Sequence, residues 1–448
     1  MNTSIRHRLP LVGAVIALCL GALAPTALAH VAPAPAAHAE APPADPAREL
    51  ARTAHPLDDL RPLGRMIGSA KVVGIGEATH SSAEFFESKH RIFEYLVEKK
   101  GFTSFALEAN WSTGLLIDDY VRFGKGDPRE ILRDEFQNAY RFWNTEEYLD
   151  LITWMREHNL RHPGHQVRFM GNDLGYAGPN LFDTVTGHVA RTYPRLLPRL
   201  QELYRDSRPV GEVDAWMNAY LLKPREERLR MASDVNRALA LLERQKPARD
   251  REEHAWMLQH ARAIAQVGTE FAYDMTGEGI DDAMLYRDRI MAENTVWWQR
   301  QTGDRMVLAA HNGHVGYETT MPDKYPRLQG AFLRDALGRD YVSMGASFGR
   351  GSFNAHDAGT QGEPIRNFTV GYPAADSSAE TLDRVSPRPF YLDLRRTTPA
   401  ARTWLDVHRP AWLIGTAYPW EGNQAPVRLA TSYDLLVHFP EISAARLR

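Results

Sequence analysis

Six short apolar runs, each followed at once by polar or small residues, constrain the fold of this 448-residue chain more than any other feature. Runs this short that are apolar throughout indicate strands buried on both faces of a sheet. Longer amphipathic patterns separate them, and alternation of strands with helices is typical of an α/β fold. We therefore predict a central, mainly parallel sheet flanked by helices. The runs are 72–75, 102–107, 167–170, 306–310, 341–344 and 412–414, and the clearest helical patterns are 85–99, 146–158 and 283–300.

The strand signal disappears between residues 180 and 279. This stretch is rich in Leu, Arg, Glu and Ala and predicts several amphipathic helices. We interpret it as a helical insertion in the α/β domain. It could cover a functional site, although a purely structural role explains the pattern equally well.

The N-terminus has the pattern of a secretory signal over residues 1–29. Arg6 and Arg8 precede an apolar segment, 11–23, and the segment Ala27-Leu28-Ala29 suits signal cleavage. We predict a secreted or periplasmic protein with no stable membrane span after cleavage; a retained anchor is the alternative. An Ala/Pro-rich stretch, 30–48, predicts a linker that precedes one α/β domain, 49–448.

Composition excludes two further classes of chemistry. Cys19 is the only cysteine and lies inside the predicted signal, so the mature chain has no thiol nucleophile, disulfide or thiolate metal site. The chain carries 53 basic and 56 acidic residues, a net charge of −3. Without a basic excess or basic stripe, we predict no nucleic-acid partner.

Ionisable side chains gather where the predicted strands end. In open α/β sheets the ligand lies at the carboxyl ends of the strands. We therefore expect these side chains to form the functional site. They are Glu77, His80, Glu108, Asp173, His311 and His314.

The segment Gly76-Glu77-Ala78-Thr79-His80 places His80 just before a predicted helix. The positive end of a helix disfavours imidazolium, which suits a histidine that accepts a proton, and Glu77 could orient it or position a water. A capped turn with an exposed histidine is the simpler alternative.

Lys89 falls on the apolar stripe of that helix, where it needs an anionic partner such as Glu77 or Glu108, or must extend past its neighbours to solvent.

His311-Asn312-Gly313-His314 follows another strand, and two histidines three residues apart could bind a metal, act as acid and base, or hold an oxyanion. Gly345-Ala346-Ser347-Phe348-Gly349 matches the nucleophile elbow of α/β-hydrolases, but no helical pattern follows the serine, as an elbow requires. There is also no H-E-x-x-H motif, so a metal site would depend on assumed proximity of the Glu and His side chains.

Taken together, the ordered motifs resemble the erythromycin esterase family over about residues 56–440. The resemblance rests on the following segments: 76–80 with Glu84-Phe85-Phe86, 101–108, Phe142-Trp143-Asn144-Thr145-Glu146-Glu147, Trp154-Met155-Arg156, Arg287-Asp288-Arg289, Met291-Ala292-Glu293-Asn294 and 311–314. It implies hydrolysis of a macrolide lactone by activated water, without a metal, a cofactor or a covalent acyl-enzyme. His80 resembles the family's general base and Glu77 its polar partner, and Glu108, His311 and His314 match further active-site positions. Lys89 stands where some macrolide esterases have arginine.

We therefore predict an exported hydrolase of a small-molecule carboxylic ester. His80, Glu77, Glu108, His311, His314 and Lys89 are the predicted catalytic residues. His80 would abstract the proton, and His314 or Lys89 would stabilise the oxyanion. A metal-dependent hydrolase or peptidase using the same Glu/His cluster, and a secreted binding protein without turnover, remain the alternatives. The sequence leaves substrate-binding residues and oligomeric state open.

Overall fold

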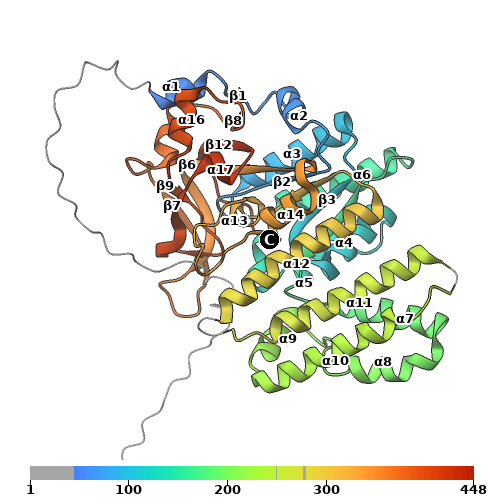
Figure 1. The fold of residues 1–448 in the computed structure, drawn as a ribbon. Helices are drawn as coiled ribbons and strands as arrows, with labels where there is room; N and C mark the ends of the chain where they lie inside the picture. Colours follow the sequence, from blue (N-terminus) through green and yellow to red (C-terminus); the bar gives the residue numbers. More distant parts are fainter. Residues whose placement is uncertain (1–44, 249, 276–278) are drawn as a thin grey trace, which may run out of the picture.

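The computed structural model describes residues 45–248, 250–275 and 279–448 (Figure 1). The predicted signal, 1–29, and most of the predicted linker lie outside these residues. The last residues of the predicted linker are helical instead, because Asp45 accepts a hydrogen bond from the Ala47 N–H and caps α1 (Pro46–Ala51). Within the described ranges, the helices are too short or too polar to cross a membrane.

A mixed sheet lies at the centre of the molecule, and its strands follow the order β1-β8-β12-β6-β2-β5-β3-β4, with β7 and β10 paired to β6. The five contacts from β12 across to β4 are all parallel, whereas β1, β7 and β8 run antiparallel to their partners. The prediction of a mainly parallel sheet is confirmed. The bounds are β1 (His55–Pro56), β2 (Val72–Ile75), β3 (Ser104–Asn110), β4 (Arg168–Asp173), β5 (Met306–Ala309), β6 (Tyr341–Asp357), β7 (Ile365–Val370), β8 (Phe390–Asp393), β10 (Ala417–Tyr418) and β12 (Leu435–Ile442).

Successive residues of the central strands face two different hydrophobic cores, because side chains alternate along a strand. In β2, Val73 and Ile75 join one core and Val72 joins the other. In β3, Phe105 faces the first core and Ala106 the second. Burial on both faces explains why the sequence shows unbroken apolar runs rather than alternation.

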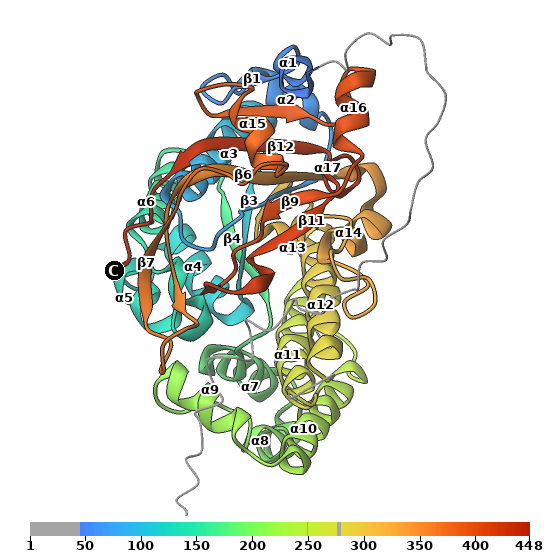
Figure 2. The same cartoon turned by 90° about the vertical axis from the view of Figure 1, so that its left-hand side faces the viewer.

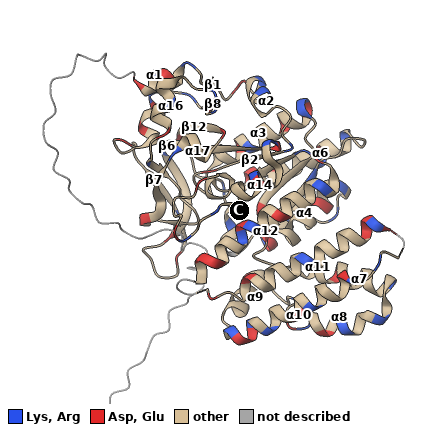
Figure 3. Ribbon diagram, viewed as in Figure 1, with Lys and Arg blue, Asp and Glu red and all other residues tan. Residues whose placement is uncertain are grey.

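Helices cover both faces of the sheet. The first core contains residues of α3, α4 and α6, and the second contains residues of α7, α8, α10, α11, α12 and α14. Basic and acidic residues are mixed along the same helices, for example α8 and α10 (Figure 3). The bounds are α2 (Arg61–Ile67), α3 (Ala83–Lys100), α4 (Trp111–Phe123), α5 (Pro128–Glu135), α6 (Glu146–Arg161), α7 (Pro179–Thr192), α8 (Leu197–Tyr204), α9 (Val213–Leu221), α10 (Arg225–Glu243), α11 (Arg251–Phe271), α12 (Gly279–Thr302), α13 (Asn312–Val315), α14 (Gln329–Leu337), α15 (Ser378–Asp383), α16 (Pro399–Leu405) and α17 (Leu429–Ser432).

The stretch interpreted as a helical insertion contains α7 to α11 and, within its described residues, no strand. These helices lie together on one side of the sheet, below α4 and α12 (Figure 2). Helix α11 packs against both α7 and α10.

Two strand predictions need correction. The run 412–414 does not enter the central sheet, because only Trp412 is in a strand, β9 (Arg409–Trp412), which pairs with β11 (Gln424–Val427) in a separate two-stranded sheet. The run 341–344 is only the start of β6, which continues for 17 residues. Strands β8 and β12 were not predicted, and Pro440 and His438 interrupt the apolar pattern of β12.

Candidate active site

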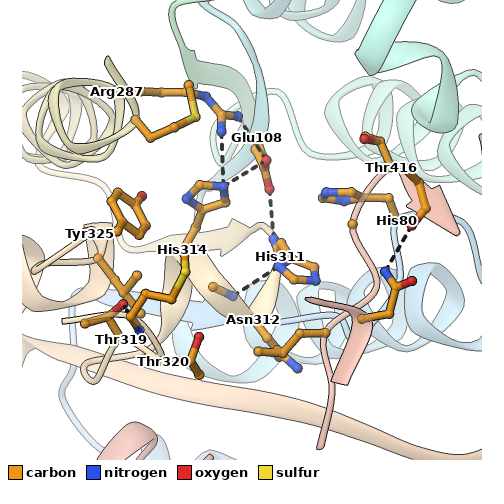
Figure 4. Close-up of a pocket in the computed structure, with 18 of the residues that line it drawn as sticks. His80, Glu108, Arg287, His311, Asn312, His314, Thr319, Thr320, Tyr325 and Thr416 are labelled. Carbon is orange, nitrogen blue, oxygen red and sulfur yellow. Dashed lines mark hydrogen bonds and ion pairs between the residues drawn. The ribbon is translucent and has the colours of Figure 1, made fainter. Parts of the chain in front are cut away.

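Three neighbouring strands bring the predicted site residues together from distant parts of the chain. Glu77 and His80 follow β2, and His311 and His314 follow β5. Glu108 lies inside β3 rather than after it, because this strand continues to Asn110. Since β5 lies between β2 and β3, their ends meet at one edge of the sheet. His80, Glu108, His311 and His314 surround one pocket there (Figure 4).

A buried carboxylate holds His80 from behind. Glu77 Oε1 lies 2.8 Å from His80 Nδ1, and its other oxygen, Oε2, accepts a hydrogen bond from the Lys89 ammonium. Glu77 is fully buried, and Lys89 is only 1% exposed. We assign the Nδ1 proton of His80 to the bond with Glu77, which leaves the lone pair on Nε2. The interpretation of Lys89 as a core lysine with an anionic partner is confirmed, and the partner is Glu77.

His311 lies beside His80, and their ring centroids are 4.9 Å apart. His311 is the N-cap of α13, and its Nδ1 accepts the Gly313 N–H at 3.2 Å. In the neutral ring the proton is therefore on Nε2, and this buried atom has no hydrogen-bond partner among the described residues. Burial lowers the pKa of His311 well below its usual value, so the ring stays neutral. The site thus contains a neutral imidazole with an unused N–H.

His314 is held in the opposite state. Its Nδ1 lies 2.5 Å from Asp288 Oδ1, and its Nε2 lies 3.2 Å from Glu108 Oε1. Burial opposes its charge, but these two carboxylates outweigh burial and raise the pKa of His314 to about 10. The same pairing with His314 overcomes burial and holds the pKa of Glu108 well below its usual range. His314 is therefore a cation at neutral pH, with both ring nitrogens donating.

Arg287 completes this charged network. It donates to Asp173 through Nε at 2.9 Å and to Glu108 through Nη2 at 3.0 Å. Tyr140 donates its hydroxyl to the same Asp173 at 2.8 Å. Arg287 Nη1 also lies 3.2 Å from His314 Nε2, where a neutral ring could accept a hydrogen bond from the arginine. Because the two carboxylates raise the pKa of His314 to about 10, the ring has no lone pair to accept with, and we take the Glu108 contact as its ion pair.

Arg287 and Asp288 were noted in the sequence only as part of the family resemblance, without a role. The sequence nevertheless contains a pattern that could have identified both residues. On α12 both lie three or four residues from Met284 and Met291, which are buried, so both charges fall on an apolar stripe. The same reasoning that singled out Lys89 on α3 would have identified them. Tyr140 and Trp143, which also line the pocket, lie in a 3₁₀ segment that no strand-end argument reaches.

The pocket has a polar floor and largely apolar walls. The floor consists of His80, Glu108, Arg287, His311 and His314, and the volume is about 160 Å³. Tyr140 and Trp143 form one wall, and His80 packs against Trp143 with 5.1 Å between ring centroids. Other walls come from the segment after α13 and from the C-terminal loops. These wall residues include Thr319, Thr320, Met321, Tyr325, Leu328, Thr416 and Trp420.

One predicted role does not fit this geometry. Lys89 does not line the pocket, because Glu77 lies between it and His80, and its ammonium is bound to the Glu77 carboxylate. Direct stabilisation of an oxyanion by Lys89 is therefore wrong, and Lys89 acts on the site only through Glu77. Glu77 likewise reaches the pocket only through His80.

The predicted ligand set for a metal is engaged in other contacts. Lys89 binds Glu77, and Arg287 and His314 bind Glu108. Over the described parts of the chain, no group of three or more His, Asp or Glu side chains is arranged to hold a metal ion. Cationic side chains here occupy the carboxylates that a metal would need.

The G-x-S-x-G segment is not a nucleophile elbow. Ser347 lies within β6, and the chain continues as a strand instead of turning into a helix. Its Oγ lies 3.2 Å from His438 Nδ1, and His438 Nε2 lies 2.8 Å from Asp383. These three groups follow the order of a catalytic triad, but none of them lines the pocket. The Ser347 backbone is paired with His438 of β12 in the sheet ladder and does not form an oxyanion hole.

Comparisons with known proteins identify a family and several relatives with similar sequences and folds. The family model for erythromycin esterase matches residues 97–442. An erythromycin esterase type II from Escherichia coli is 25% identical over 319 residues, which cover 67% of this chain and 73% of the relative. The crystal structure of a Bacillus cereus protein is similar with a TM-score of 0.80 and 30% identity, over 91% of this chain and 100% of that chain. A mutant erythromycin esterase in its open conformation, 16% identical, shares the fold with a TM-score of 0.64, over 87% of this chain and 95% of that one.

Proposed function

We propose that this chain, which belongs to the erythromycin esterase family, hydrolyses carboxylic esters with water activated by His80. The observation that carries the proposal is the pairing of two histidines in complementary states. His80 presents a lone pair on Nε2, and the neighbouring His311 presents an unpaired Nε2–H. Glu77, His80 and Lys89 precede the segment that the family model matches, so their roles rest on the structure.

In the proposed reaction, His80 Nε2 takes a proton from a water molecule as the oxygen adds to the ester carbonyl carbon. The C–O bond to the alcohol then breaks, and the His80 imidazolium returns the proton to the departing oxygen. The products are a carboxylic acid and an alcohol, with no covalent bond to the protein. Glu77 stabilises the transient imidazolium through Nδ1 at 2.8 Å, and Lys89 keeps Glu77 ionised and in place.

His311 is the proposed oxyanion donor. Its Nε2–H is aimed by the bond that Nδ1 accepts from Gly313, and it has no ground-state partner to give up. A neutral imidazole donor in a buried site stabilises a developing negative charge at little cost of reorganisation. This assignment replaces His314 and Lys89, the two candidates from sequence.

His314 is unsuited to proton abstraction, because both of its nitrogens donate to carboxylates. We assign it and Arg287 a fixed positive charge at the pocket floor. Glu108 links this charge to His311, because its Oε2 accepts the His311 backbone N–H at 2.8 Å. The network therefore positions the oxyanion donor and favours the anionic transition state.

A macrolide lactone is the first substrate to test, because the relative from Escherichia coli is named for erythromycin. We also propose that residues 1–29 export the protein, so that hydrolysis would take place outside the cytoplasm.

A metal-dependent hydrolase or peptidase is less compatible with the carboxylates bound by Lys89 and Arg287. A binding protein without turnover would not require the unpaired His311 N–H.

The test is incubation of purified protein with erythromycin and with a panel of simple esters, in the presence and absence of a chelator. Products are identified by mass spectrometry. Gain of one water by the ester, abolished in His80→Asn and unaffected by the chelator, supports the proposal. Activity lost with the chelator and restored by a metal would favour the metal-dependent alternative. Binding without product, unchanged in His80→Asn, would favour the binding protein.

A further inference from the structure

The catalytic pocket is small, and it adjoins a shallow groove outside it. The pocket volume of about 160 Å³ is below the roughly 300–1,000 Å³ of sites that bury a drug-sized ligand. The adjoining groove has a volume of about 410 Å³. Trp420 and Asn423 line both, so the two spaces lie side by side at this turn. We call this second space the outer groove.

Three aromatic residues, Trp412, Tyr418 and Trp420, line the outer groove. Trp412 stacks on Phe348 with 5.9 Å between centroids and 17° between planes. Tyr418 packs edge to face on Phe353 and Phe368, with centroids 5.2 and 5.1 Å away. These core contacts fix the inner sides of Trp412 and Tyr418, so the groove wall is ordered before a ligand binds.

The turn that carries Trp420 is also fixed. Asn423 is buried, accepts the Trp420 backbone N–H at 2.6 Å and donates to the Ala417 carbonyl at 3.0 Å. Asn423 is therefore committed to the turn and does not recognise a ligand. Trp420 is held at a defined position between the pocket and the outer groove.

Polar side chains border these aromatic faces. Glu421 and Gln424 are exposed and line the outer groove. Throughout the described residues, neither side chain makes a hydrogen bond or an ion pair with the protein. A carboxylate and an amide beside aromatic rings offer acceptors and donors to hydroxyl groups.

We propose that the outer groove binds a sugar ring on the non-reacting part of the ester, as a subsite of the proposed esterase. A sugar has an apolar C–H face, which suits the aromatic rings, and a rim of hydroxyl groups, which suits Glu421 and Gln424. The ester linkage lies in the small pocket beside His80 and His311. This inference rests on the proposed function for its position, because Trp420 and Asn423 line both spaces and place them side by side. The substrate class is therefore an ester of a glycoside.

The test uses two acetate esters that differ only in the ring. One is the acetate of the primary alcohol of methyl glucoside, and the other is cyclohexylmethyl acetate, which lacks the hydroxyl groups and the ring oxygen. The measured quantity is the ratio of kcat/KM for the glucoside ester to kcat/KM for the cyclohexyl ester. The wild type is expected to prefer the glucoside ester, and Trp420→Ala to lower the ratio roughly tenfold. Glu421→Gln, a surface change that should not impair folding, is expected to lower it roughly threefold.

The matched control is Tyr372→Ala, because Tyr372 is an aromatic residue that is 81% exposed and lines neither space. It should leave the ratio unchanged. An unchanged ratio in both Trp420→Ala and Glu421→Gln would overturn the sugar subsite while leaving the esterase intact. If neither ester is cleaved, the proposed esterase function fails, and binding of methyl glucoside is then followed by tryptophan fluorescence. Saturable quenching lost in Trp420→Ala would support the sugar site, and the absence of quenching would overturn it.

Discussion

On each side of the pocket, buried carboxylates bind a histidine, and the two histidines differ in how many of their ring nitrogens are bound. On one side, Glu77 binds one nitrogen of His80, and the lysine behind it binds the other carboxylate oxygen. On the other side, Asp288 and Glu108 bind both nitrogens of His314. One carboxylate orients an imidazole and leaves it a free nitrogen. Two carboxylates turn an imidazole into a fixed cation.

The comparison shows that function follows from the number of partners rather than from residue type. His80 can exchange a proton because Nε2 has no partner among the described residues. His314 cannot, because two anions hold both of its protons against the opposing effect of burial. His311 lies between these cases, neutral and with one unused donor.

The largest expected effect is loss of the free nitrogen of His80. His80→Asn keeps a polar group of similar size near Glu77 but removes the base. We expect kcat to fall by roughly 10²–10⁴-fold, with KM changed much less. Steady-state kinetics on a cleaved ester measure this, with Tyr372→Ala as the control. Retention of more than about a tenth of kcat would exclude His80 as the base.

Lys89→Met tests the role of the lysine behind Glu77. It leaves a buried carboxylate without its cation, at a cost of about 3–5 kcal/mol in the free energy of unfolding. We expect kcat to fall by about tenfold or more as Glu77 loses its position. Urea unfolding measures the loss of stability, and steady-state kinetics measure the loss of kcat.

Lys89→Arg is the matched variant, since it keeps the charge and changes the geometry. It should therefore retain more of kcat than Lys89→Met. A kcat as low as that of Lys89→Met, in a folded protein, would contradict a role for the lysine charge.

His314→Gln should change the pH dependence of stability. The pKa of His314 is about 10, above the ordinary value of 6.5, so its contribution is complete below pH 6.5 and is lost as pH rises through about 10. The wild type should therefore lose stability over this range. The glutamine variant should be less stable at neutral pH by about 1–3 kcal/mol and lack this alkaline loss. Urea unfolding at several pH values measures both, and an identical alkaline slope in the two proteins would contradict a cationic His314.

Ser347→Ala is expected to have the smallest effect. Ser347 lies in β6 away from the pocket, so kcat should be unchanged and the stability lowered by about 1 kcal/mol at most through the lost His438 contact. Turnover and thermal unfolding of the same sample check this. Loss of activity in a folded Ser347→Ala protein would instead identify Ser347, His438 and Asp383 as the catalytic groups.

The sequence predicted the parallel core of the sheet because β2 to β5 are buried on both faces and appear as unbroken apolar runs. It did not predict β12, where Pro440 and His438 interrupt the pattern, nor the length of β6, whose later residues mix glycine and polar residues with apolar ones. It misplaced residues 412–414, because a short apolar run gives no information on which sheet it joins.

For the candidate site, the rule that ligands lie at strand ends led to His80, His311 and His314, which lie on one pocket. The same rule could not show which nitrogens are free. That depends on Asp288, which lies on α12, and on the Gly313 N–H at the start of α13. The role of Lys89 was mistaken for the same reason, since its distance from the pocket depends on how α3 packs behind Glu77.

The most direct test of this account of the histidines is ¹⁵N NMR of ring-labelled histidines at a pH between 7 and 9. Signals of individual rings are assigned with His80→Asn, His311→Gln and His314→Gln. The account predicts an imidazolium with both nitrogens protonated for His314, a His80 whose Nδ1 carries a proton, and a neutral His311 protonated on Nε2. A neutral His314, or a His80 tautomer with its proton on Nε2, would contradict it.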